Sequence, residues 1–375
     1  MQEWIDRTTA LARMGIRAQT LYAYVSRGRI GMQPDPDDPR RSLYSADDIE
    51  ALKVRRARGK GRAAVANSTM AWGEPSLETA ISTVHQGQLI YRGTDAISLS
   101  DHASWEEAAT LLWRSNPRVS LTPTGAVQGN PFSALATLVP ESWSTLGRGE
   151  DKLHADSVAA IATLADALGA APSPGPLHER IAQGWSLPNA FHDPLRRALV
   201  LLADHELNAS TFAVRVAAST GAPIAACLLA GLSALSGPRH GGAGAAAIAL
   251  LDSARRSGPK AALKEILASG RHLPGFGHPL YPGGDPRSAA LLPVLPVDAL
   301  TEDLLGEAVE MSGLEPNIDF ALAVLARSGP FPDDMPFRLF ALGRSAGWLA
   351  HAVEQISSGR LIRPRARYVG DLPRS

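Results

Sequence analysis

The sequence is poor in cysteine, and it has no excess of charge of one sign. Cys227 is the only cysteine among 375 residues, so no disulfide can form within the chain and no thiolate cluster can hold a metal. We therefore expect a reducing, cytoplasmic location, with Cys227 as a small buried side chain. Lysine plus arginine and aspartate plus glutamate both number 37, so the whole chain lacks the charge bias typical of nucleic-acid or membrane partners.

Targeting and membrane signals are also missing from the sequence. The start, MQEWIDRTTA, lacks the basic end, apolar centre and small-residue cleavage site of a signal peptide, so we expect no export. The longest weakly polar stretch, residues 221–237, is shorter than the roughly 20 residues of a bilayer span and contains Pro223. It therefore predicts a buried helix, and we expect no membrane partner.

The charges that are present are divided unevenly along the chain. Residues 1–62 hold thirteen basic and eight acidic side chains, whereas the remainder holds 24 basic and 29 acidic ones. With 45% apolar residues, the chain has material for one large catalytic unit and one small accessory domain. We predict a domain at 1–62, a linker at 63–74, where small and basic residues show no apolar period, and a catalytic domain at 75–375.

The N-terminal domain has the pattern of a helix-turn-helix. A cap at Thr8 opens a helical run, Gly15 breaks it, and a second run begins near Gln19. A turn-rich segment follows, and Ser45 with Asp48 three residues later has the spacing of a capping box that opens another helix. The expected order is therefore helix, turn, helix, wing and helix.

This segment resembles the MerR-type and excisionase-type winged helices over most of residues 1–62. The resemblance implies that the second helix enters a DNA major groove; it bears Gln19, Thr20, Tyr22 and Tyr24. Gln19 and Thr20 would reach base edges, and nearby arginines would contact phosphates, namely Arg17, Arg27, Arg29, Arg40 and Arg41. Such units also serve as packing or dimerisation modules, so an assembly role without nucleic acid stays open.

The rest of the chain alternates amphipathic runs with proline- and glycine-rich breaks. Helical spacing of apolar residues occurs in SWEEAATLLWR, HADSVAAIATLADALG, DPLRRALVLLADHELNASTFAVRVAAST and DSARRSGPKAALKEILASG. Alternating strand patterns are scarce, and GGAGAAA at 241–247 lacks the spacing of a nucleotide-phosphate loop. We therefore predict an all-α catalytic body.

Polar islands interrupt this helical sequence at DHELN (204–208), GPRHGG (237–242), GFGHPLYPGGDPR (275–287) and PNIDF (316–320). His240 lies at a tight turn that opens a helix, where the positive helix end favours a neutral imidazole that can donate to an enolate oxygen. Asp319 lies in an apolar setting, where desolvation would raise its pKa and suit it to remove a proton next to a carbonyl. A single histidine is more often structural, but the joint occurrence of these islands favours catalysis.

A second set of residues combines a rigid turn with arginines. His278 lies between a glycine and a proline, and Arg287 follows nine residues later, which fits a carbonyl polariser beside a carboxylate clamp. Arg344 in ALGRSAGWLAH and Arg363 in LIRPRARY are further fixed cations, and arginine is the side chain best shaped for bidentate carboxylate binding. Several arginines predict a di- or tricarboxylate substrate.

In this order the islands resemble citrate synthase over nearly the whole of residues 75–370. GPRHGG, GFGHPLYPGGDPR, PNIDF and GRSAGWLAH followed by RPR form a combination that would rarely coincide, and YRGTDAISL at 91–99 resembles the family's early motif. The resemblance implies an all-helical fold whose large and small domains close over substrate, with the small domain at about 243–332. It also implies a homodimer that condenses acetyl-CoA with oxaloacetate and hydrolyses citryl-CoA, a step of the tricarboxylic acid cycle.

The same resemblance implies a role for each residue. Asp319 would be the base, His240 would stabilise the enol of acetyl-CoA, and His278 would polarise the oxaloacetate ketone. The oxaloacetate carboxylates would be bound by His205, Arg287, Arg344 and, from the partner subunit, Arg363. CoA enters as a substrate, and we expect neither a bound cofactor nor a metal.

The sequence departs from the family in two places and leaves alternatives open. The segment PLYPGG after His278 carries no basic residue where relatives usually direct one to the CoA phosphates, and the stretch from His278 to Asp319 is short. A 2-methylcitrate synthase would use propionyl-CoA with the same catalytic set. A metabolite-sensing regulator would bind oxaloacetate or an acyl-CoA in its body and DNA at its N-terminus, although the intact catalytic trio argues against a sensor without activity.

Overall fold

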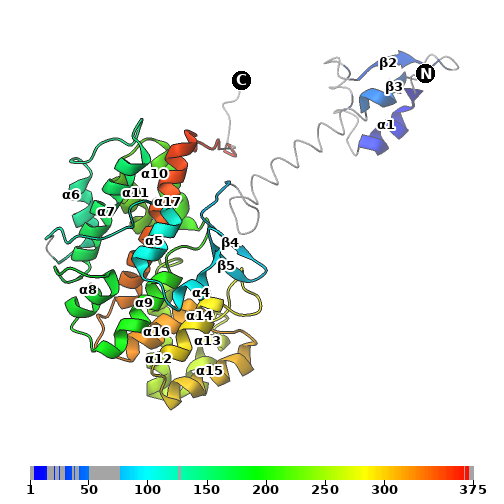
Figure 1. The fold of residues 1–375 in the computed structure, drawn as a ribbon. Helices are drawn as coiled ribbons and strands as arrows, with labels where there is room; N and C mark the ends of the chain where they lie inside the picture. The colour runs from blue at the N-terminus through cyan, green and yellow to red at the C-terminus, as the bar shows by residue number, and fades with distance from the viewer. Residues whose placement is uncertain are drawn as a thin grey trace. The chain divides into compact units, whose positions relative to one another are not determined.

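The computed structural model describes residues 4–14, 21, 25, 30–35, 38, 42–49, 77–125, 128–366 and 368–370. By its internal contacts the chain separates into two compact units, Met1–Glu78 and Thr79–Ser375 (Figure 1). The first is a small α/β unit, and the second is a large helical body.

The N-terminal unit holds a small antiparallel sheet and a helix. Strands β1 (Trp4–Ile5), β3 (Ser42–Ser45) and β2 (Met32–Pro34) lie side by side in that order, and helix α1 spans Arg7–Met14. The unit has its own hydrophobic core, made by Ile5, Ala10, Met14, Leu21, Ile30, Tyr44, Ala46 and Ile49. Burial of these side chains stabilises the unit without help from the body.

One local prediction for this unit is corrected and one is confirmed. The first helix is capped by Asp6 and not by Thr8, because Asp6 Oδ1 accepts a hydrogen bond from the Thr9 N–H at 2.9 Å. The Asp48 N–H donates to Ser45 Oγ at 3.2 Å, and residues 46–49 are helical, as expected. The helix-turn-helix assignment stays a prediction, because its groove-facing residues, its phosphate-contacting arginines and the linker at 63–74 lie outside the described residues.

The body is mostly helical, as predicted. Its α-helices are α4 (Ala96–Ser100), α5 (Trp105–Trp113), α6 (Pro131–Leu138), α7 (Glu150–Ala167), α8 (Leu177–Gly184), α9 (His192–Leu201), α10 (Ala209–Ser219), α11 (Ile224–Leu235), α12 (Ala243–Ser257), α13 (Pro259–Ala268), α14 (Pro286–Leu291), α15 (Ala299–Ser312), α16 (Ile318–Arg327) and α17 (Met335–Ser358). Two short 3-10 helices, η1 (Asn189–Phe191) and η2 (Leu292–Val294), join them.

Helix α17 forms the centre of the body, and α5, α7, α9, α10 and α11 pack around it (Figure 1). Its small residues allow close approach: a Cβ added at Gly347 would lie 2.1 Å from Asp204 Oδ1. Trp105 Nε1 donates to the Gly343 carbonyl at 3.1 Å, and Trp113 Nε1 donates to the Ala346 carbonyl at 2.8 Å. The GRSAGWLAH motif therefore lies in the core, where its polar side chains can be fixed.

Helices α12 to α16 form a second group beside this centre. Helix α12 packs against α13, α15 and α16, and α14 packs against α16 (Figure 1). The group falls within residues 243–332, the region expected to be a small domain, and the exact domain limits stay a prediction. The segment DSARRSGPKAALKEILASG, expected as one amphipathic run, is divided into α12 and α13, because Gly258 has a φ of +87° and ends α12.

The all-α prediction for the body is corrected at one place. Strands β4 (Ser82–His85), β5 (Gln88–Tyr91) and β6 (Thr94–Asp95) form an antiparallel sheet in that order. The turn between β4 and β5 consists of Gln86 and Gly87, with φ angles of +51° and +78°, as a tight two-residue hairpin requires. Within the motif YRGTDAISL, Tyr91 ends β5, Thr94 and Asp95 form β6, and Ala96 begins α4.

The weakly polar stretch at 221–237 contains α11, which is buried in the core as predicted. Cys227 lies on this helix and is fully buried, which confirms the expectation of a small buried side chain. Among the described residues, no helix combines the length and the apolar character needed to span a bilayer.

Candidate functional site

The loop before His278 and the start of α16 are joined through their backbones. The Gly277 N–H donates to the Glu315 carbonyl at 2.8 Å, and the Asn317 N–H donates to the Gly275 carbonyl at 2.8 Å. The Asn317 side chain adds a third bond, from Nδ2 to the Gly277 carbonyl at 2.9 Å. These bonds make one rigid piece of GFGH and PNIDF, although about 40 residues separate the two motifs.

Asp319 lies in the first turn of α16. Asn317 caps this helix, because its Oδ1 accepts from the Asp319 N–H at 3.0 Å. The Asp319 side chain is half-buried, and desolvation raises its pKa to about 6 despite the opposing charges of Arg287 and Arg344. A carboxylate with this pKa is a stronger base than an exposed aspartate, as the sequence predicted.

Asp285 connects Arg287 to the same helix. Its two oxygens accept from Arg287 Nε at 3.0 Å and Nη2 at 2.8 Å, and Oδ2 also accepts from the Ile318 N–H at 3.0 Å. Arg287 is 2% exposed and Asp285 is 3% exposed. Although burial opposes ionisation of both groups, their pairing lowers the pKa of Asp285 and raises that of Arg287, so both stay charged.

His205, His278 and Tyr281 form an aromatic cluster beside Arg287. The rings of His205 and His278 lie 5.1 Å apart between centroids, and His205 Nε2 lies 3.0 Å from the Tyr281 hydroxyl. The Leu280 N–H donates to His278 Nδ1 at 3.2 Å, so the neutral ring carries its proton on Nε2. Burial, and then Arg287, lower the pKa of His278 to about 4, and burial with Arg287 and Arg344 lowers that of His205 well below its usual value.

His240 lies in the turn between α11 and α12. Its Nε2 lies 2.8 Å from Ser210 Oγ, which has one proton to share between His240 and the Asn208 Oδ1 at 2.7 Å. Trp348 Nε1 donates to the same Ser210 oxygen at 3.1 Å. Burial, and then the charge of Arg344, lower the pKa of His240 to about 4. This lowered pKa agrees with the neutral imidazole predicted here, and burial and Arg344 are its causes.

The turn that bears His240 leads directly toward Asp319. A Cβ added at Gly244, in the first turn of α12, would lie 4.0 Å from Asp319 Oδ1 and 2.6 Å from Pro336 Cβ. The close approach to Pro336 requires glycine at this position, and the start of α12 lies within van der Waals distance of the Asp319 carboxylate. His240 and Asp319 therefore come from neighbouring helix ends.

Arg344 is buried in α17 with one end unpaired. It is 1% exposed, and its Nε donates to the Leu202 carbonyl at 2.9 Å. Its Nη2 is also buried and has no hydrogen-bond partner among the described residues. An unsatisfied buried N–H is costly, and a carboxylate oxygen is the strongest acceptor that a ligand could supply to it.

Six of the seven predicted site residues gather in this cluster, which brings together His205, His240, His278, Arg287, Arg344 and Asp319. They lie within electrostatic range of one another, since the charges of Arg287 and Arg344 both act on the pKa values of His205 and Asp319. Arg363 does not join them, because it is exposed on the segment after α17. Its assignment to a partner's site stays a prediction.

Sequence reasoning missed the residues that hold this cluster together, namely Ser210, Tyr281, Asp285 and Asn317. Two of them carried a signal. Asp285 belongs to the DPR motif and precedes a proline at the start of a helix, and Asn317 stands before Ile318 in the position of a helix cap. Ser210 and Tyr281 gave none, because only the fold brings them to His240 and His205.

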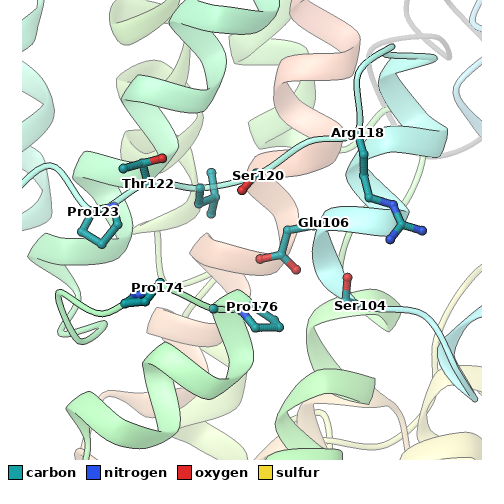
Figure 2. A pocket seen from close by; sticks show the side chains of 10 residues that line it. Ser104, Glu106, Arg118, Ser120, Thr122, Pro123, Pro174 and Pro176 are labelled. Atoms are coloured by element: carbon teal, nitrogen blue, oxygen red, sulfur yellow. The ribbon is translucent and has the colours of Figure 1, made fainter.

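A separate hollow of about 330 Å³ lies near α5 and α8, and its chemistry differs from that of the cluster (Figure 2). Glu106 extends into it between Ser120 and Pro176, and Glu106 Oε1 accepts from the Leu177 N–H at 2.7 Å (Figure 2). This carboxylate thus closes the N-terminus of α8, which has no side-chain cap of its own. The hollow contains none of the predicted site residues, so the cluster is the better candidate.

The fold of the body is that of solved citrate synthases. The crystal structure of citrate synthase from Thermotoga maritima superposes with a TM-score of 0.66 and 27% identity, covering 81% of this chain and 96% of that one. A ternary complex of citrate synthase from Thermoplasma acidophilum with carboxymethyl coenzyme A and oxaloacetate has the same fold, with a TM-score of 0.64 and 22% identity over 82% and 97% of the two chains.

Sequence comparison identifies the family. The model of the citrate synthase C-terminal domain matches residues 141–365, so the chain belongs to the citrate synthase family. It is 41% identical over 189 residues to the putative citrate synthase 2 of Mycobacterium tuberculosis (47% of this chain, 51% of that protein). It is 38% identical over 193 residues to citrate synthase of Haloferax volcanii (46% and 49%). The chain thus spans about half the length of the curated relatives it matches.

Proposed function

We propose that this protein condenses acetyl-CoA with oxaloacetate and hydrolyses the resulting citryl-CoA to citrate and CoA. The observation that carries the proposal is the buried Arg344, whose unpaired Nη2 lies in the cluster that also holds Arg287 and Asp319. Two arginines are buried in the cluster, and although Arg287 is paired with Asp285, the Nη2 of Arg344 has no hydrogen-bond partner among the described residues, which suits a substrate that carries carboxylates. Oxaloacetate is such a substrate.

The first step is removal of a proton from the methyl group of acetyl-CoA. Asp319 takes this proton. Its raised pKa lies closer to the high pKa of the methyl group, which makes the proton transfer easier. His240, neutral above a pH of about 4, donates a hydrogen bond to the thioester oxygen as it becomes an enolate. When the Ser210 hydroxyl donates to Nε2, the proton of His240 is left on Nδ1 for this role.

The second step forms the new carbon–carbon bond. The enol carbon attacks the oxaloacetate ketone, and His278 Nε2–H donates to the ketone oxygen, which becomes the hydroxyl of citryl-CoA. Arg287, Arg344 and His205 hold the carboxylates, so the ketone faces the enol. Water then cleaves the thioester and releases CoA as a thiol, which makes CoA a substrate and product and leaves no role for a cofactor.

Thiol release tests the proposal directly. The purified protein should release free thiol with oxaloacetate plus acetyl-CoA, and Asp319→Ala should abolish release. Asp298→Ala is a matched control, because Asp298 likewise lies at the start of a helix, capping α15, but is exposed outside the cluster. If the folded wild-type protein releases no thiol with any acyl-CoA, the proposal fails and the sensor function takes its place.

A 2-methylcitrate synthase is the second candidate. The chain is 36% identical over 199 residues to the 2-methylcitrate synthase of Shewanella oneidensis, covering 50% of this chain and 53% of that protein. The same acid, base and arginines would serve propionyl-CoA, so only the space beside His240 separates the two substrates. A higher kcat/KM for propionyl-CoA than for acetyl-CoA would favour this function.

The site is proposed to be completed by a second subunit. Arg363 is exposed on the C-terminal segment, where it is available to reach the oxaloacetate of a partner. Sedimentation should then show a dimer. Mixing Asp319→Ala with Arg363→Ala subunits should restore activity, because one site of the mixed dimer receives an intact copy of each residue.

DNA binding by residues 1–62 is a further proposal. It is supported by the basic balance of this segment and by the antiparallel β2 and β3, which have the form of a wing after a helix. Binding should weaken steeply with salt, and replacing Arg27 and Arg29 with glutamate should remove it. If wild-type protein binds no DNA at low salt, the assembly function of this unit replaces it.

A further inference from the structure

A polar network runs behind the site, from the loop that bears His205 to the end of α17. Asp204 and His351 are fully buried, and Arg215 is 3% exposed. His351 Nε2 lies 3.3 Å from Asp204 Oδ2, and His351 Nδ1 lies 3.2 Å from Arg215 Nη1. The proposed reaction uses none of these three residues.

The partners of His351 fix its protonation. A guanidinium nitrogen can only donate, so His351 Nδ1 accepts and the neutral ring carries its proton on Nε2, facing Asp204. Ser82 Oγ donates to the same Asp204 oxygen and accepts from the Glu206 N–H at 3.0 Å. Ser82 thereby holds both neighbours of His205, Asp204 through its carboxylate and Glu206 through its backbone N–H.

The other end of the network holds the C-terminal segment. Arg215 Nε donates to Gln355 Oε1 at 3.0 Å, which orients the amide so that Gln355 Nε2 donates to the Arg360 carbonyl at 2.7 Å. Arg360 lies three residues before Arg363. A continuous chain of hydrogen bonds thus links the start of the His205 loop to the start of the Arg363 segment.

We infer that His351 is a positioning residue that sets His205 for oxaloacetate in its own site and, through Arg215 and Gln355, sets the segment that presents Arg363 to the partner's site. This inference rests on the proposed function. The buried imidazole of His351 would then orient His205 in one active site and Arg363 in the active site of the partner.

Stability alone does not account for this network. Burying a carboxylate and a guanidinium carries a desolvation cost, and well-packed apolar residues of similar volume are often at least as stabilising. What the ionic network adds is geometry, since hydrogen bonds are directional and Arg215 Nη1 is held by both His351 Nδ1 and Glu354 Oε2. The residues that it fixes, at 204–206 and 360, flank His205 and precede Arg363.

Two substitutions at one position separate positioning from packing. His351→Gln keeps a donor and an acceptor at about the spacing of the two ring nitrogens, whereas His351→Leu keeps only the volume. In His351→Leu we expect the KM for oxaloacetate to rise about tenfold or more, with the KM for the acyl-CoA within about twofold of wild type. His351→Gln should recover most of this loss.

The matched control is His178→Leu, at a histidine that is 8% exposed and lies beside Glu179. It should leave the KM for oxaloacetate unchanged, because the same change is made at a buried histidine that has no contact with the network. An unchanged KM in His351→Leu, or equal losses in the leucine and glutamine variants, would overturn the inference.

Calorimetric titration with oxaloacetate alone separates failure of this inference from failure of the proposed function. If wild-type protein binds oxaloacetate without turnover, the synthase function fails, and tighter binding to His351→Gln than to His351→Leu still supports the positioning role. Equal binding to both variants, or no binding to the wild type, overturns it. In an active enzyme, Arg363→Ala should have a smaller effect in the His351→Leu background than alone.

Discussion

Two arginines are buried to the same depth in the body, but their surroundings differ. Arg180 in α8 is 1% exposed, and its donors are used: Nε bonds the Ala171 carbonyl at 2.9 Å and Nη2 bonds Asp166 Oδ1 at 2.7 Å. Arg344 in α17 is also 1% exposed, yet its Nη2 has no partner among the described residues. A buried cation whose donors are used holds a fold together, whereas one with an unused donor is prepared for a ligand.

Arg287 stands between these two cases. Its Nε and Nη2 are paired with Asp285, as in a structural ion pair, but it also lies against Tyr281 with its charge acting on His205 and His278. Loss of a buried arginine should therefore reduce stability more when the arginine is paired with a carboxylate, and reduce activity more when it has a donor available to the substrate. The same change to leucine at each of the three positions tests this rule.

The largest combined effect is expected for Arg287→Leu. The buried Asp285 would lose its cation while still capping α14 and α16, which should cost about 3 kcal/mol of unfolding free energy. Loss of a substrate carboxylate contact should also lower kcat/KM for oxaloacetate about a thousandfold. Urea unfolding and initial rates measure the two losses, and a stable variant with low activity would contradict the dual role.

Arg344→Leu should give the largest effect on activity alone. No direct ion pair is broken by this change, because Arg344 Nε bonds only a carbonyl, but the buried Asp204 loses a nearby positive charge. The free energy of unfolding should therefore fall by about 1 kcal/mol, less than for Arg287→Leu. The kcat/KM for oxaloacetate should still fall about a thousandfold. Normal activity would show that the unpaired Nη2 does not bind substrate.

Arg180→Leu should show the opposite pattern. Asp166 would stay buried with hydrogen bonds from Thr124 and Gly125 but without its cation, so unfolding should become easier by about 3 kcal/mol. The folded variant should keep the wild-type kcat/KM. A change in KM for oxaloacetate would mean that this pair also serves the site.

The smallest expected effect is the dependence of activity and stability on pH. Because Asp319 must be ionised to act as base, kcat/KM should fall about tenfold for each pH unit below about 6, while His240 and His278 stay neutral down to a pH of about 4. The raised pKa also means that Asp319 loses its stabilising contribution as the pH rises through about 6. Asp319→Asn should therefore gain stability over wild type between pH 4 and 7, by about 1–2 kcal/mol. If the difference in unfolding free energy between Asp319→Asn and wild type did not change with pH, the raised pKa of Asp319 would be contradicted.

The residues proposed to be catalytic could be picked out because turns and helix starts mark them in the sequence. His240 and His278 stand beside glycine or proline, and Asp319 follows the helix cap Asn317 by two residues; such residues determine the local backbone whatever the rest of the fold does. The hairpin at 82–91 was missed because its strands are four residues long, too short for a clear alternation.

The residues that support the site were harder to predict, because they depend on contacts between distant segments. Ser210 reaches His240 across 30 residues, and Asp204 reaches His351 across 147. No local pattern distinguishes these side chains from ordinary capping or core residues. Only the packing of α10 against α17 brings them into one network.

The hydrogen bonds that join residues 275–277 to residues 315–317 have a consequence for inhibitor design. Because they make His278 and Asp319 parts of one piece, the spacing between the ketone polariser and the base is built in and does not depend on how the rest of the site is arranged. A rigid inhibitor that contacts only His278 and Asp319 would bind with the same affinity however the other residues of the site are placed. Selectivity for one arrangement would have to come from a flexible arm that reaches His240.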